Sequence, residues 1–527
     1  MDATAREPRP RTRPRELDAG NRPGCPYPRL DGGPPSRVRG PLGFASTASA
    51  GVGGECPPIE NKPDDVPHVK YDGVKHLTYC YGPVSVKPGQ NYIRLKSTDL
   101  FPRRPGYITR FDPELVYTNG RVPRVDVLHL HHAVWLVNLN PQFAVGEEKT
   151  ILQLPKGFGW RTRPSDNWLL NDMLHDLVGR AADVYIVWRI DFVPDTAPAA
   201  DRIHEVRTRW MDVAGPRIYP VFDALRGMGS DGRYTFPNQT TGADRDLIGP
   251  AQKWTIDHPV TLIATAGHLH PGGLKTTLRV ARDGRHRTLF RSNAHYYEPA
   301  GAVSWDVSMR ATRPDWRVKL RPGDTLSIHA TYDVHRADWY EVMGIMPVVV
   351  YDGTDAGGVG AFRDVPERGV LTHGHLAENN HHGGKSTDLP DPRLLSSFAP
   401  APDPVGIQDY LYEQGDLHAG TSGAKPPTID PGQTLRFQNY DGGAPVSTFH
   451  TITACKAPCN RSTGIAYPIA NGPVTFDSGQ LGFNVSFGAP AADRDTWATP
   501  DNLKPGTYTY FCRVHPFMRG SFRVAQP

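Results

Sequence analysis

Short runs that alternate between apolar and polar residues recur along the chain, separated by turns rich in glycine and proline. The clearest runs are residues 125–137, 434–440 and 507–513. This period of two is typical of strands with one buried face, and apolar stripes at helical spacing are scarce. The pattern predicts a mainly β protein made of β-sandwiches.

Length and composition support several compact β domains. The 527 residues leave room for three or so domains, given roughly 100–200 residues for each. Glycine (53) and proline (52) make up about a fifth of the chain, against about 12% in an average protein. No apolar run approaches the ~18 residues that a membrane helix needs, so we expect no integral membrane segment.

Positive charge is concentrated at the N-terminus. The formal net charge is +4, and the first forty residues carry the same excess, with nine arginines against five acidic residues. The remainder is close to neutral, which argues against nucleic acid as a partner. Residues 1–55 have few large apolar side chains and are predicted to be a disordered leader. Ala48-Ser49-Ala50 has the form of an export cleavage site after a weak apolar region, so we expect a degenerate export signal and a secreted or cell-envelope location.

The cysteines allow two small bridges. Six are too few for a disulfide scaffold. Cys455 and Cys459 are close enough in sequence for a small-loop disulfide, and Cys56 with Cys80 is a second candidate pair. Bridges at these positions would indicate an oxidising compartment. Ordinary buried thiols are the alternative.

Metal-ligand residues gather near the C-terminus. Cys512, His515 and Met518 lie in one short loop between alternating runs, and His450 lies on another such run about sixty residues upstream. One thiolate, two imidazoles and a thioether are the ligands of a blue-copper site, and the sulfur suits both Cu(I) and Cu(II). We predict that these four residues hold one type 1 copper.

The loop Cys512-Arg-Val-His515-Pro-Phe-Met518, with Tyr508-Thr-Tyr-Phe before it and Arg-Gly after it, resembles the amicyanin and plastocyanin group of cupredoxins. The resemblance covers residues 401–527. It implies a cupredoxin Greek-key β-sandwich for outer-sphere electron transfer, with an external redox donor or acceptor protein as partner. It also implies that electrons pass through His515.

Four upstream features also carry candidate copper ligands. An alternating run ends in His129, His131 and His132. Neighbouring side chains on a regular strand point to opposite faces, so a bulge or a strand end is needed for His131 and His132 to hold one ion. The second feature is residues 154–160, followed by His175. The third is the pair His268 and His270, whose spacing puts two imidazoles on one face of a strand. The fourth is the segment 340–346, in which Met343 supplies a thioether.

In this order the features resemble the copper type II monooxygenases, the family of peptidylglycine α-hydroxylating monooxygenase and dopamine β-monooxygenase. The resemblance covers about residues 60–355. It implies two jelly-roll-like β-sandwiches, predicted at 56–200 and 201–355, with a linker rich in histidine, glycine and proline at 356–400 before the cupredoxin domain.

The resemblance also implies up to two further copper ions. It makes His268, His270 and Met343 the catalytic ligands of an oxygen-activating copper. His131 and His132 correspond to the adjacent pair on an electron-donating copper.

The chain departs from the family at the third ligand of the electron-donating copper. The alignment places Asp191 where the family has a histidine. Our preferred replacement is His175, in a segment at 168–177 that we interpret as helix-like. Asp191 as an oxygen ligand is the alternative. Met346 lies three positions from Met343 and therefore should face the other side of a strand.

Substrate recognition departs as well. Ala266 stands where the peptide-hydroxylating enzymes have an arginine that holds a carboxylate, and Ile345 and Pro347 replace an asparagine and a tyrosine. A peptide ending in glycine is therefore not expected as the substrate. We expect an unknown small molecule instead.

Three functions follow as hypotheses. In the first, the chain is a copper-dependent oxidoreductase whose type 1 copper domain feeds a two-copper monooxygenase-like module that hydroxylates a C–H bond with O₂. The alternative is a non-catalytic copper-binding or electron-transfer protein. A third, a copper-handling device, rests on the linker histidines, although a solvated linker is the simpler interpretation of that stretch. These are His373, His375, His381 and His382.

Overall fold

The computed structural model describes most of the chain after residue 55. The described residues are 56–527 without 61–65, 88–92, 126, 178–179, 216–219, 241, 298–301, 303–304, 336, 368, 372–384, 387–388, 396–397, 420–424, 442–447, 460, 463–473, 483–493 and 516. The predicted leader at 1–55 and the four linker histidines lie outside the described residues.

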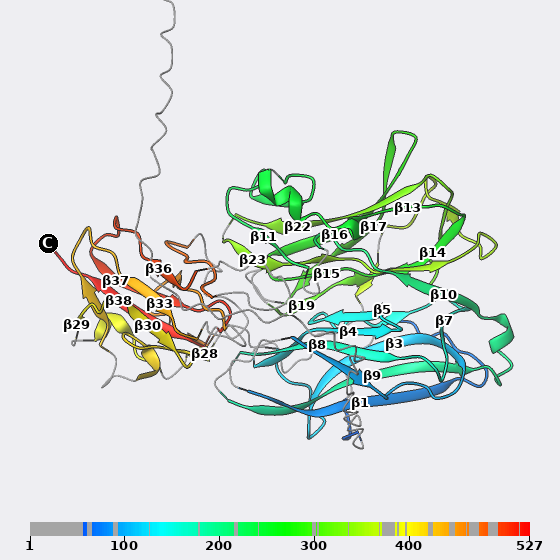
Figure 1. Ribbon diagram of the computed structural model, residues 1–527, viewed down its shortest axis with the longest axis horizontal. Coiled ribbons are helices and arrows are strands. Elements are labelled where there is room, and N and C mark those ends of the chain that lie inside the picture. The colour runs from blue at the N-terminus through cyan, green and yellow to red at the C-terminus, as the bar shows by residue number, and fades with distance from the viewer. Residues whose placement is uncertain are drawn as a thin grey trace, which may run out of the picture. The chain divides into compact units, whose positions relative to one another are not determined.

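The described part is almost entirely β, which confirms the fold class predicted from the alternating pattern (Figure 1). Its helical segments are short 3₁₀ turns such as η2 (Gly242–Leu247). Within these residues no helix is long and apolar enough to cross a membrane.

A four-stranded sheet carries the first group of histidines. Its order is β2 (Ile93–Thr98), β8 (Trp168–Asp176), β4 (Leu128–Val137) and β5 (Asn140–Gly146). Its buried face packs on a second sheet through large aromatic side chains. The Trp135 ring of β4 lies 4.8 Å from Phe111 and 5.3 Å from Trp188, measured between ring centroids.

That second sheet continues through most of the upstream part of the chain. Its order is β1 (Lys75–Val86), β9 (Ala182–Pro194), β3 (Gly106–Tyr117), β7 (Phe158–Thr162), β10 (His204–Arg209), β25 (Val348–Tyr351), β14 (Val260–Thr265), β21 (Val318–Leu320) and β26 (Val359–Gly360), with β6 (Leu152–Gln153) beside β3. Strand β10 is parallel to β7 and antiparallel to β25. The sheet therefore runs across the boundary predicted between residues 200 and 201.

A five-stranded sheet and a short ribbon complete this region. The sheet contains β12 (Arg233–Phe236), β22 (Thr325–Asp333), β16 (Gly273–Arg282) and β17 (Arg285–Asn293), with β13 (Lys253–Thr255) beside β22; Figure 1 draws them in green. The ribbon pairs β15 (His268–Leu269) with β24 (Gly344–Ile345), and His268 is opposite Ile345. This pairing brings the His268 segment to the segment that contains Met343.

The C-terminal part consists of two sheets around their own apolar core. One contains β29 (Ala399–Pro400), β32 (Pro427–Ile429), β38 (Arg519–Val524), β37 (Gly506–Phe511) and β34 (Thr453–Cys455). The other contains β31 (Leu411–Tyr412), β30 (Val405–Gln408), β33 (Arg436–Asn439) and β36 (Thr496–Ala498). Their shared core includes Phe437, Tyr510 and Phe522.

Two details bear on the sequence predictions. Both predicted disulfides are present, Cys56 with Cys80 and Cys455 with Cys459, whereas Cys512 is a buried free thiol. The helix-like interpretation of residues 168–177 is wrong, because Trp168–Asp176 is strand β8. This segment lies between β2 and β4, and its backbone groups pair with both neighbours, which a helix could not do.

Candidate copper centres

The structure brings together His450, Cys512 and His515. The Cys512 Sγ atom lies 3.8 Å from Nδ1 of each histidine, and the two Nδ1 atoms are 3.2 Å apart. Both side chains thus point the same nitrogen at the thiol. A soft sulfur and two imidazole nitrogens converging in this way suit copper in either oxidation state.

The hairpin between β37 and β38 delivers the predicted axial ligand. The Met518 N–H donates to the His515 carbonyl at 2.9 Å, and the Cys512 N–H donates to the Met518 carbonyl at 3.3 Å. All four predicted ligands are 0% exposed. The tight loop therefore holds Met518 beside Cys512 in a site shielded from solvent. The role of Met518 as a ligand stays a prediction.

Hydrogen bonds prepare the C-terminal site for a metal. The backbone N–H groups of Thr451 and His515 donate to Cys512 Sγ at 3.4 and 3.3 Å, which stabilises a thiolate there. Asp441 accepts a hydrogen bond from His450 Nε2 at 2.9 Å. This bond places the proton on Nε2 and leaves the Nδ1 lone pair for a metal. His450, Cys512, His515 and Met518 are called the C-terminal copper set below.

Upstream, four buried histidines surround the Trp305 ring. The ring centroids of His131 and His270 are 4.7 Å apart, and those of His129 and His175 are 4.9 Å apart. We call this group the histidine cluster. Its members lie 4.7 to 6.3 Å from the Trp305 centroid and are His129, His131, His175 and His270.

The imidazoles of the histidine cluster are neutral at physiological pH. Burial lowers the pKa of His175 to about 4 and lowers the pKa of His129, His131 and His270 well below their usual value. Three ring nitrogens have no hydrogen-bond partner within the described part of the chain, namely His129 Nε2, His175 Nδ1 and His270 Nε2. Unpartnered buried nitrogens are costly, and a bound metal ion would remove that cost.

Strand β4 bulges at the position that the sequence indicates. The register against β8 shifts between Leu130 and His132, so His131 is the extra residue. The bulge does not bring the neighbouring histidines to one cavity, however. His131 lies in the histidine cluster, whereas the His132 Nε2 atom bonds the Asn171 side-chain oxygen at 2.8 Å and lines a different cavity.

The two candidates for the third ligand lie in different places. His175 is opposite His129 on the adjacent strand, and its ring centroid is 6.1 Å from that of His131. Asp191 belongs to β9 of the large sheet, where its carboxylate accepts a hydrogen bond from His76 at 2.6 Å. The structure thus brings His175 to His131, and His175 as a copper ligand stays a prediction.

His175 also contacts the C-terminal copper set. Its Nε2 atom donates to the Val514 carbonyl at 2.7 Å, and its ring centroid lies 6.4 Å from that of His515. His175, His131 and His270 line a cavity whose other wall includes Arg513 and Val514. The histidine cluster and the loop that contains Arg513 and Val514 therefore face each other across one cavity.

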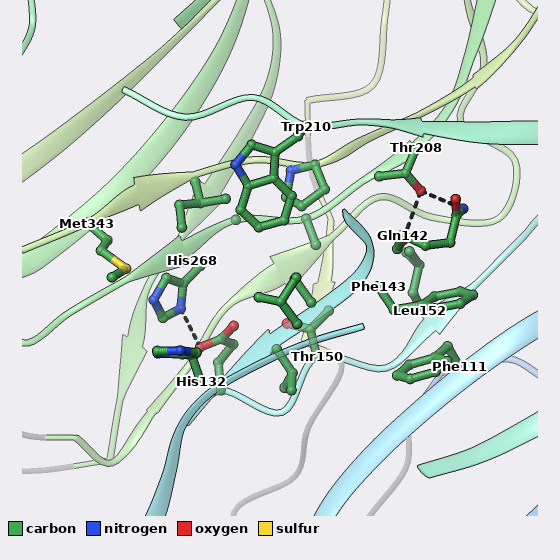
Figure 2. A pocket seen from close by; sticks show the side chains of 18 of the residues that line it. Phe111, His132, Gln142, Phe143, Thr150, Leu152, Thr208, Trp210, His268 and Met343 are labelled. Atoms are coloured by element: carbon green, nitrogen blue, oxygen red, sulfur yellow. Dashed lines mark hydrogen bonds and ion pairs between the residues drawn. The ribbon is translucent and has the colours of Figure 1, made fainter. Parts of the chain in front are cut away.

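A second cavity contains the other predicted ligands. Figure 2 shows His132, His268 and Met343 in the wall of this cavity. The Met343 sulfur points toward the His268 ring. Met346, by contrast, is fully buried in the hydrophobic core. We call this space the His268 cavity.

The predicted ligand sets are interleaved. His270, expected to share a copper with His268 and Met343, lies in the histidine cluster, where its Nδ1 atom donates to the Glu341 carbonyl at 2.7 Å. His132, expected beside His131, lies with His268 instead. The His268 and His270 rings are nevertheless neighbours, 5.3 Å apart.

Three residues of these centres were not predicted as site residues. Glu148 accepts a hydrogen bond from His268 Nδ1 at 3.0 Å, and this leaves the Nε2 lone pair available to a metal. Trp305 fills the middle of the histidine cluster, and His129 is one of its members. His129 shares a strand face with His131 in the sequence, which was a usable signal. Neither Glu148 nor Trp305 belongs to a motif that would have indicated it.

Comparisons with known proteins give only weak likenesses. No family model and no curated protein matches the chain. A reduced tryptophan-to-tyrosine mutant of amicyanin is 18% identical over 26% of this chain and 99% of its own, with a TM-score of 0.15. A copper-containing nitrite reductase (NirK) from Thermus scotoductus SA-01 is 17% identical over 50% of this chain and 55% of its own, with a TM-score of 0.16. A PBCV-1 virus capsid chain is 8% identical over 54% of this chain and 96% of its own, with a TM-score of 0.24. Scores this low carry no argument about activity.

Proposed function

We propose that the chain is a copper-binding electron-transfer protein in which the C-terminal copper set and the histidine cluster form one redox unit. The hydrogen bond from His175 to the Val514 carbonyl carries the proposal. It joins strand β8 of the upstream sheet to the loop that contains Cys512 and His515.

The donor atoms support copper rather than a harder ion. The C-terminal set combines a thiolate, a thioether and two imidazoles, and the histidine cluster offers neutral imidazoles. Hard ions such as Mg²⁺ and Ca²⁺ prefer oxygen ligands. Copper bound by these residues would supply one-electron transfer between Cu(I) and Cu(II).

His175 has the chemistry of a bridge. Its Nε2–H group donates a hydrogen bond to the Val514 carbonyl. Its Nδ1 lone pair is therefore available to a copper ion held by the histidine cluster. Only Arg513 separates Cys512 from Val514 in the sequence. The path from the Cys512 sulfur to the His175 ring is therefore covalent except for one hydrogen bond.

The finer proposal is that this redox unit serves a monooxygenase-like reaction. Hydroxylation of a C–H bond with O₂ consumes two electrons, and a fused one-electron carrier would replace a diffusing reductant. The shared cavity of His268 and Met343 supports this. An external redox protein would exchange electrons with the C-terminal set, and the His268 cavity would hold a small-molecule substrate.

The second candidate function is a non-catalytic electron carrier or copper-binding protein. The interleaving of the ligand sets favours it, because His270 lies with His131 rather than in the His268 cavity. In either case we propose a secreted or cell-envelope location. The two disulfides support an oxidising compartment.

Flash photoreduction of the copper-loaded whole chain under nitrogen tests the redox unit. If the C-terminal set passes electrons to the histidine cluster, the bleached blue absorption recovers in a first-order phase whose rate does not depend on protein concentration. His175→Phe should slow this phase at least about tenfold and leave the absorption spectrum unchanged. His204→Phe, at an exposed histidine of β10, is the matched control and should recover like the wild type. Recovery that is purely bimolecular in the wild type, or unchanged in His175→Phe, would contradict the proposal.

A further inference from the structure

We infer that the His268 cavity binds a small, uncharged and largely apolar organic molecule. This names the substrate class of the monooxygenase-like function proposed above and rests on that proposal for its catalytic meaning. The binding itself follows from the cavity wall and requires no copper.

The wall of the cavity is mainly hydrophobic and comes from both layers of the upstream fold. The cavity has a volume of about 90 Å³ and lies next to His268 and Met343. Aromatic and aliphatic side chains account for most of the lining, and Figure 2 shows Trp210 opposite Phe111 and Phe143. The principal apolar residues are Phe111, Val134, Phe143, Val145, Leu152, Trp210 and Val349.

The charge of the cavity excludes a carboxylate ligand. Neither lysine nor arginine occurs among the described residues that line it. Its carboxylate, Glu148, already accepts hydrogen bonds from His268 Nδ1 and from the Gly146 N–H, both at 3.0 Å. An anion entering the cavity would lose its hydration, meet no lysine or arginine and lie near Glu148, which is unfavourable in an apolar site.

The polar groups of the wall leave room for few hydrogen bonds to a ligand. Gln142 and Thr208 are already joined by two hydrogen bonds of 2.9 Å, and Trp160 Nε1 donates to the same Thr208 hydroxyl. The buried Thr150 hydroxyl, in contrast, has no partner within the described part of the chain. A ligand with an apolar body and few polar groups therefore matches this wall.

Calorimetric titration of the metal-free whole chain with indole tests the inference, and indole-3-carboxylate is the charged counterpart. We expect indole to bind with a negative heat-capacity change, as burial of apolar surface requires. Indole-3-carboxylate should bind at least about tenfold more weakly. No binding of indole, or equal affinity for the two compounds, would overturn the inference.

Two variants assign the binding to this cavity. Ala266→Arg places a cation in the wall and should abolish indole binding, while Ala281→Arg makes the same change at a partly buried strand position outside the cavity and should not. Ala144→Leu fills the cavity without adding charge and should weaken indole by about tenfold or more. Wild-type affinity in both Ala266→Arg and Ala144→Leu would place the indole elsewhere and reject the cavity. Because copper is absent throughout, this result is independent of the photoreduction experiment.

Discussion

At each candidate metal centre the hydrogen-bond partner of a histidine selects which ring nitrogen faces the metal. Asp441 accepts a hydrogen bond from Nε2 of His450, and the Val514 carbonyl accepts one from Nε2 of His175. In both rings the Nδ1 lone pair is left for a metal. Glu148 instead accepts a hydrogen bond from Nδ1 of His268, and the Glu341 carbonyl accepts one from Nδ1 of His270. In these two rings the Nε2 lone pair is left for a metal. Such hydrogen-bond partners fix the orientation of the ring and make the opposite nitrogen a stronger metal ligand. Sequence spacing alone carries none of this information.

The two neighbouring methionines should respond differently to the same substitution. Met343→Ala removes a thioether beside His268, and we expect it to weaken copper binding upstream while the C-terminal copper set stays filled. Met346→Ala leaves a cavity in the core and should cost about 2–5 kcal/mol of stability with little change in copper affinity. Competition with a Cu(I) chelator and thermal unfolding distinguish the two effects. The reverse pattern would show that Met346 is the ligand.

At the level of strands, pairing positions the candidate ligands. His131 and His132 face different cavities despite the bulge in β4, and the pairing of β15 with β24 brings Met343 to His268. The loop between β21 and β22 is held in another way. Arg282 of β16 donates to both carboxylate oxygens of the fully buried Asp324, which also accepts from the Arg321 N–H.

Asp324→Asn should therefore destabilise the upstream sheets. It leaves a partly buried guanidinium with a neutral partner and removes a charged hydrogen bond, at a cost of about 1.5–3 kcal/mol. Thermal unfolding should show a lower midpoint. Asp315→Asn makes the same change in an exposed ion pair with Arg313 and should shift the midpoint much less, because exposed pairs contribute about 1 kcal/mol or less. Equal shifts for the two variants would contradict the role assigned to Asp324.

The sequence was informative where a pattern is local and less so where contacts are distant. Alternation predicted the β fold, and the C-terminal loop delivers Cys512, His515 and Met518 within seven residues, so their convergence was predictable. Strand β8 was misread because its central residues, Asn171 and Asp172, interrupt the apolar pattern. Its strand state comes from pairing on both edges. The interleaving of the ligand sets arises from contacts such as His131 with His270, which lie far apart in the chain.

At the scale of the whole molecule, His175 contacts both the histidine cluster and the C-terminal loop. The C-terminal copper set has the donor chemistry of a type 1 site, the histidine cluster has neutral imidazoles, and His175 contacts both. An apolar cavity next to the same cluster leaves space for a small molecule. The proposed redox unit requires that copper be held by Cys512.

The most direct test is the visible and EPR spectrum of the copper-loaded whole chain, recorded with a copper count, beside that of Cys512→Ala. Charge transfer between a thiolate and Cu(II) gives type 1 sites their intense blue colour, so the wild type should be blue with a type 1 EPR signal. Cys512→Ala should be colourless and should lose that signal, while any type 2 signals from upstream copper persist. A wild-type protein that binds copper without turning blue, or a Cys512→Ala protein that stays blue at undiminished intensity, would contradict the account.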